Sequence, residues 1–311
     1  MLPDAAMLDS MGTRCESMAK SAMPLGSMRI VAAILAAAPH LLGQTNIRPM
    51  LDRLTTEAGA FEKLAIQVTG QETIHQRLLK SPPRFRPRVG EAAKKTPQLE
   101  WRQRDIVSLY GISIVGRTLH EIRQVISVDG KMVQGEARAQ ETLAQLLTSS
   151  GDQQKLQALR QLEKYSLGGA ATDFGPLILV FAHGGAERYE FTVAGPRLLG
   201  TAPAQGYRFK QLDGTEGLTL FAGQPQKLRM EGEIWMADAP EGPIRITLSS
   251  TVLGAESGDG PPVREEASVD YDRTAFGALL PAHIEQREFH AGEVTAENVF
   301  DYENFRRLAD R

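Results

Sequence analysis

Residues 279–305, LLPAHIEQREFHAGEVTAENVFDYENF, carry the clearest structural pattern of the chain. Two alternating runs flank residues 290–293, which include Gly292. In the second run an apolar side alternates with a polar side: Val294, Ala296, Phe300 and Tyr302 against Thr295, Glu297, Asp301 and Glu303. A period of two with a glycine at the bend predicts a long antiparallel hairpin. One face of such a hairpin covers a core while the other faces water.

The same pattern recurs through most of the chain. Further strands are predicted over residues 64–78, 102–115, 119–128, 188–193, 207–212, 218–221, 229–236, 244–252 and 263–271. A short helix is predicted over residues 47–58, with Gly59 at its end. The remaining helices are predicted mid-chain. Apolar residues have helical spacing over residues 136–148 and 152–165, and Asp173 is placed to cap a third, short helix.

These elements predict an α+β fold built on a large curved antiparallel sheet. Roughly ten strands joined by short turns form a sheet long enough to curl into a half-barrel. We expect a few helices to pack on its concave face with their apolar stripes. The space between such helices and a curved sheet suits an apolar ligand.

Composition sets limits on the function. The chain has 311 residues, of which 42% are hydrophobic, enough for one large domain or two small ones. A net charge of -3 gives no reason to expect nucleic acid as a partner. Cys15 is the single cysteine, so an internal disulfide and a cysteine-based zinc site are both excluded.

The N-terminal segment has the pattern of an export signal. Met28 and Arg29 precede the apolar run IVAAILAAAPHLL, and Gly43 follows it. We interpret residues 1–44 as an N-terminal extension and signal peptide, cleaved near Gly43, and residues 45–311 as the folded domain. The alternative is a buried N-terminal helix. Export predicts a periplasmic or secreted protein of the bacterial cell envelope.

A basic, proline-rich segment interrupts the strands at residues 80–97, KSPPRFRPRVGEAAKKTP. Its composition predicts a loop. Lys80, Arg84, Arg86 and Arg88 are candidates for contact with anionic lipid headgroups. A solvated basic loop is the simpler interpretation.

Three stretches resemble a known family. They are MEGEIWMAD at 230–238, PIRITL at 243–248, and residues 279–308, which contain a Leu-Pro, Asn and Tyr-x-x-Phe hairpin pattern. They resemble the lipoprotein-carrier (LolA/LolB-like) superfamily, in particular its uncharacterised exported branch. The resemblance implies a half-barrel that holds acyl chains or other apolar ligands. It also implies that residues 45–311 form one LolA/LolB-like domain. No lipobox accompanies Cys15, so a membrane-anchored receptor is not expected.

The candidate cavity residues are apolar and aromatic. Met230, Ile234 and Met236 share one side of a predicted strand, and methionine suits an adaptable cavity wall. Trp101 and Phe85 border the basic segment and are candidates for a cavity mouth. The simpler alternative for Met230, Ile234 and Met236 is that they are ordinary core residues. For Trp101 and Phe85 it is that they hold the basic loop in place.

No motif indicates catalysis. Gly-x-Ser-x-Gly is absent, and no two histidines are spaced three or four apart on a predicted helix. A cross-strand metal site, for example His283 with Glu285 or Glu297, and a carboxylate pair remain open. We therefore predict a non-enzymatic exported protein without a cofactor that binds a lipid, a lipidated protein or another apolar ligand. The alternatives are a cell-envelope interaction module and, behind it, a carboxylate- or metal-dependent hydrolase.

Overall fold

The computed structural model describes residues 47–80, 99–149, 151–167, 173–221, 224–253 and 263–308. The predicted signal peptide, and residues 81–98 with Phe85, Arg84, Arg86 and Arg88, lie outside these ranges. Within them, twelve strands form one antiparallel sheet in the order β4-β3-β2-β1-β12-β11-β10-β9-β8-β6-β5, and β7 pairs with β8.

The strands are β1 Val68–Leu79, β2 Trp101–Val115, β3 Thr118–Val128, β4 Lys131–Met132, β5 Tyr189–Leu199, β6 Ala202–Gln211, β7 Gly217–Phe221, β8 Gln224–Ala237, β9 Ile244–Leu253, β10 Val263–Arg273, β11 Leu279–His290 and β12 Glu293–Arg307. The helices are α1 Arg48–Ala65, α3 Glu136–Thr148, α4 Asp152–Leu159, α5 Gln161–Tyr165 and the two 3-10 helices η1 Gly175–Phe181 and η2 Gly185–Arg188.

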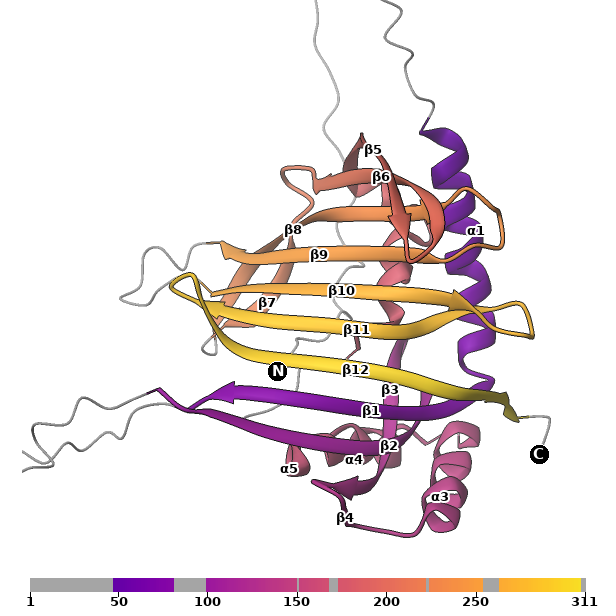
Figure 1. Ribbon diagram of the computed structural model, residues 1–311, viewed down its shortest axis with the longest axis vertical. Helices are drawn as coiled ribbons and strands as arrows, with labels where there is room; N and C mark the ends of the chain where they lie inside the picture. The colour runs from indigo at the N-terminus through magenta and orange to yellow at the C-terminus, as the bar shows by residue number, and fades with distance from the viewer. Residues whose placement is uncertain are drawn as a thin grey trace, which may run out of the picture.

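The predicted C-terminal hairpin is confirmed and lies at the centre of the sheet. His290 of β11 pairs with Glu293 of β12 across a two-residue turn. Both turn residues have a positive φ, 52° at Ala291 and 83° at Gly292, as a tight hairpin turn with the twist of its strands requires. β12 then pairs antiparallel with β1, so that the first and last strands lie side by side (Figure 1).

Helix α1 lies across the strands on one side of the sheet (Figure 1). Its buried residues recur at helical spacing: Met50, Leu54, Ala58, Phe61 and Ala65. The helix therefore runs through Gly59 and Leu64, and the prediction that it ends before them is wrong. Leu64, Ile66 and Val68 do alternate, but the longer 3.6-residue pattern decides the conformation up to Ala65.

The main core lies between α1, η1 and the concave face of the curved sheet, which confirms the predicted fold class. One row of inward side chains crosses seven neighbouring strands and is almost wholly buried: Ile106, Ile74, Phe300, Ile284, Val269, Ile246 and Ile234. Full burial of each such side chain contributes about 1.5–3 kcal/mol. This row is the main apolar surface of the concave face.

Helices α3 and α4 pack elsewhere. They cover the opposite face of β2 and β3, where Ile122, Leu143, Leu146 and Ala158 form a second small core. Gly111 permits this contact, because a Cβ atom there would lie 2.8 Å from Leu147 of α3. Thus only some of the helices occupy the predicted concave position. In the described part of the chain, no helix combines the length and apolar character needed to cross a membrane.

Candidate functional site on the concave face

The 3-10 helix η1, GPLILVF, occupies the concave side of the sheet and buries Leu177, Ile178 and Phe181. Seven residues is long for a 3-10 helix, because its hydrogen-bond geometry is poorer than that of an α-helix. Left-handed backbone brackets the segment, with φ 67° at Asp173 and 48° at His183. The predicted Asp173 cap is not formed: Phe174 occupies the cap position without a side-chain bond.

Aromatic rings pack beside η1. The ring of Phe181 lies 5.2 Å from that of Phe209 and 5.6 Å from that of Tyr189, measured between centroids. Burial raises the pKa of Tyr189 to about 12. The aromatic and aliphatic groups together make η1 part of the main core.

The structure places the three candidate residues of β8 on this concave face. Ile234 and Met236 are buried, and Met230 is partly buried against the same core. They form one apolar strip along β8, as the alternation predicts. Whether they contact a ligand stays a prediction.

Trp101 is not near this strip. It lies at the start of β2, with β1, β12, β11, β10 and β9 between β2 and β8. Its ring carries the guanidinium of Arg77 at 4.8 Å and is partly exposed. Lys80, at the start of the basic segment, forms an exposed ion pair with Glu100 at 3.3 Å.

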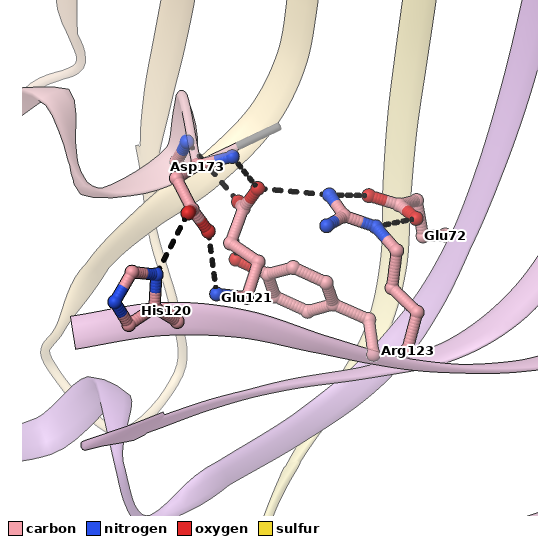
Figure 2. Close-up of polar contacts among 7 residues, drawn as sticks. Glu72, His120, Glu121, Arg123 and Asp173 are labelled. Carbon is pink, nitrogen blue, oxygen red and sulfur yellow. Dashed lines mark hydrogen bonds and ion pairs between the residues drawn. The ribbon is translucent and has the colours of Figure 1, made fainter. Parts of the chain in front are cut away.

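A buried charge cluster lies on the concave side of β1 and β3 (Figure 2). The guanidinium of Arg123 donates to both carboxylate oxygens of Glu72, at 2.6 and 2.7 Å. It also donates to Glu121 at 2.8 Å. All three side chains are at most 2% exposed. The bidentate geometry and the second carboxylate compensate for the burial of the cation.

The cluster shifts the pKa of its members. Burial raises the pKa of Glu121; Arg123 opposes the shift, while Asp173 and Glu72 add to it. Burial alone would lower the pKa of Arg123, but Glu72 and Glu121 outweigh it and hold that pKa well above its usual value. Burial also raises the pKa of Tyr110, whose hydroxyl donates to Glu121 at 2.9 Å.

Glu121 connects this cluster to η1 (Figure 2). Its carboxylate accepts hydrogen bonds from the backbone N–H groups of Asp173 at 2.8 Å and Gly175 at 3.1 Å. The carboxylate of Asp173 in turn accepts from the N–H of Glu121 at 2.7 Å and lies 2.9 Å from His120 Nδ1. A side chain at Gly175 would clash with the Glu121 carboxylate and the Tyr110 hydroxyl.

Tyr271 of β10 provides the second anchor of η1. Its hydroxyl donates to the carbonyl of Gly175 at 2.8 Å and accepts from the N–H of Ile178 at 2.9 Å. Burial raises the pKa of Tyr271, so the hydroxyl stays neutral and keeps its proton to donate. Two side chains, Glu121 and Tyr271, therefore bind the backbone of η1 to the sheet.

A row of polar side chains borders the apolar row on the side away from the Arg123 cluster. Gln76 donates to Asn298 at 2.8 Å, Asn298 to Gln286 at 2.6 Å, and Gln286 to Glu265 at 2.8 Å. The row crosses β1, β12, β11 and β10. Burial raises the pKa of Glu265. The concave face thus has an apolar middle between two polar zones.

The histidines and carboxylates outside the core do not gather into a metal site in the part of the chain that the structure describes, where no group of three or more His, Cys, Asp or Glu side chains could hold an ion. His283 lies on the other face of the sheet, with Nδ1 2.7 Å from Asp301 and Nε2 3.6 Å from Glu285. Asp301 and Glu285 raise its pKa against the opposing effect of burial.

Comparisons with known proteins add distant structural likenesses. No family model and no curated protein matches the chain. A domain from Vibrio parahaemolyticus, described as an outer membrane lipoprotein-sorting protein, is 8% identical over 84% of this chain and 93% of its own, with a TM-score of 0.34. A DUF1329 family protein from Desulfovibrio piger is 7% identical over 85% and 94%, with a TM-score of 0.31.

A LolA superfamily protein from Nitrosomonas europaea is 13% identical over 82% of this chain and 95% of its own, with a TM-score of 0.23. At these TM-scores only part of each backbone superposes.

Sequence reasoning missed the anchors of η1. Glu121 and Arg123 stand two apart in a predicted strand, which placed them on one face but did not show that this face is buried. Their partner Glu72 lies on β1, with β2 between the two strands. The signal present in the sequence is the Glu-x-Arg pair Glu121 and Arg123 within a predicted strand.

Proposed function

We propose that this protein is a non-enzymatic binding protein that holds a lipid acyl chain or a similar apolar ligand on the concave face of its sheet. The ligand takes the place of η1. One observation carries the proposal: an apolar 3-10 segment, not a regular helix, covers the inward row of the sheet and is tied to it by two side chains.

The energy of exchange sets the ligand size. Leaving the core exposes Leu177, Ile178 and Phe181, at about 1.5–3 kcal/mol each. A buried methylene returns about 0.8 kcal/mol, so a chain of roughly six to eleven methylenes compensates for the three side chains. Long acyl chains meet this requirement, and short ones do not.

The remainder of the proposal concerns location and partners. An exported protein with such a binding face would meet lipids or lipidated proteins in the cell envelope. Lys80, Arg84, Arg86 and Arg88 would contact anionic headgroups during loading. The export signal over residues 1–44 supports this placement through its sequence pattern.

Fluorescence titration with cis-parinaric acid tests the proposal. We expect saturable binding at one molecule per chain, weakened about tenfold by Met236→Gln, because an amide in an apolar site costs about 1–3 kcal/mol. Leu198→Gln is the matched control, since Leu198 is 66% exposed on β5. Thermal unfolding of each variant checks that the fold is kept. Absence of saturable binding by the unmodified protein would refute the proposal.

A further inference from the structure

The face of the sheet opposite α1 contains a depression lined mostly by polar and charged residues. It is an open trough of about 620 Å³ that crosses β5, β6 and β8 to β11. Its floor is made by the small side chains Thr247, Ser249 and Ser268 and by the backbone at Gly232. Residues next to the floor in sequence, such as Ile246, point the other way into the core.

Longer charged side chains form the two walls of this trough. Glu266, Glu285 and Arg287 stand on β10 and β11. Facing them across the floor, β5, β6 and β8 contribute Glu190, Arg208, Lys210, Glu231 and Glu233. The hollow exists because short hydroxyl residues on β9 and β10 lie between long residues on both sides.

Several polar groups in the trough lack a partner within the described part of the chain: the side chains of Ser249, Ser268, Lys210 and Glu231 form no hydrogen bond or ion pair there. By contrast, Arg208 pairs with Glu233 at 3.0 Å and Arg287 with Glu285 at 3.2 Å. The trough therefore offers fixed charged groups beside free hydroxyls, an amine and a carboxylate.

The balance of charge selects the class of ligand. Five carboxylates and three cationic groups line the trough, so its formal charge is -2. Such mixed signs repel polyanions and give no strong field for a polycation. They do provide many donors and acceptors at short spacing. A ligand rich in hydroxyl groups, which both donate and accept, uses this surface best.

We propose that the trough is a binding site for a neutral oligosaccharide. Its volume lies within the range of about 300–1,000 Å³ typical of ligand sites. Carboxylates accept from sugar hydroxyls, while guanidinium and amine groups donate to them. The trough lies on the face of the sheet opposite α1 and η1, so the site is independent of the concave face and of the function proposed above.

Isothermal titration with four neutral tetrasaccharides tests the site: β-1,4-linked N-acetylglucosamine, β-1,4-glucose, α-1,4-glucose and β-1,3-glucose. We expect saturable binding of at least one. Ser249→Trp and Ser268→Trp fill the floor and should weaken it more than tenfold. Glu231→Ala, an exposed change that leaves packing intact, should weaken it several-fold.

Thr73→Trp provides the matched control. Thr73 lies on the same face of the sheet but on β1, outside the trough, and the change should leave binding unaltered. Binding of none of the four sugars overturns the proposal. So does binding that survives both floor-filling variants, or tighter binding of polylysine or dextran sulfate than of any neutral sugar.

Discussion

Arg123 joins two buried carboxylates and has no solvent contact of consequence, with its side chain 2% exposed. Its contribution to stability differs from that of a surface ion pair, because water cannot solvate the buried carboxylates when the guanidinium is removed. Glu72 and Glu121 would then remain buried without a cation. Such uncompensated charge is among the most destabilising changes in a protein interior.

Arg123→Met should therefore lower the free energy of unfolding at pH 7 by about 3–5 kcal/mol, measured by urea denaturation. Arg208→Met is the matched control. Arg208 pairs with Glu233 on the surface and is 61% exposed, so its loss should cost about 0–1 kcal/mol. Equal effects of the two substitutions would contradict the structural role of the buried cluster.

The raised pKa of His283 makes its contribution to the free energy of unfolding depend on pH, with a sign that can be predicted. Its pKa in the folded protein is raised from the ordinary value of 6.5. The stabilisation from its charged form is complete below that value and is lost as the pH rises through the folded pKa. The stability advantage of the unmodified protein over His283→Gln should shrink as the pH increases across neutrality.

Urea denaturation at a series of pH values measures this difference. Asp301→Asn serves as the control, since Asp301 accepts from His283 Nδ1 at 2.7 Å and its carboxylate raises that pKa. In the Asp301→Asn background, replacement of His283 should leave a much flatter pH profile. An advantage that grows with pH would contradict the assigned pair.

At the residue scale the sequence predicted the direction of side chains better than their environment. Alternation in β8 correctly put Met230, Ile234 and Met236 on one face. It could not show that Glu121 and Arg123 are buried, because burial depends on strands far away in the chain.

At the scale of elements, η1 is the least regular part of the core. Its backbone depends on Tyr271, whose hydroxyl serves both Gly175 and Ile178. Removing that hydroxyl deletes two hydrogen bonds to the backbone of η1, each worth about 0.5–1.5 kcal/mol. The side-chain packing of η1 would persist.

Tyr271→Phe should thus lower the free energy of unfolding by about 2 kcal/mol. It should also tighten binding of cis-parinaric acid, because the ligand displaces a more weakly held segment. Tyr207→Phe is the control: Tyr207 is half-buried on β6, and its hydroxyl makes no hydrogen bond within the described residues. Weaker ligand binding by Tyr271→Phe would argue against displacement of η1.

Element boundaries were predicted unevenly. The hairpin of β11 and β12 could be predicted, because its alternation and its turn residues agree. The end of α1 could not, because Leu64 and Ile66 satisfy both a strand and a helix period. The 3-10 conformation of η1 had no sequence signal apart from Pro176, since its anchors come from β3 and β10.

At the scale of the molecule, the two faces of the sheet have different chemistry. The concave face is apolar in its middle and is covered by α1 and η1. The opposite face is charged and includes the polar trough, while α3 and α4 cover it at β2 and β3. Pairing of β1 with β12 places the first and last described strands side by side in one open sheet (Figure 1). No local pattern encodes this long-range pairing.

Hydrogen–deuterium exchange with and without a saturating long-chain fatty acid tests most directly whether the concave face binds ligand by displacing η1. We predict faster exchange at the amides of residues 177–182 in the presence of the fatty acid, with the amides of β11 and β12 unchanged. Unchanged or slower exchange at residues 177–182 while the ligand is bound would contradict the displacement of η1.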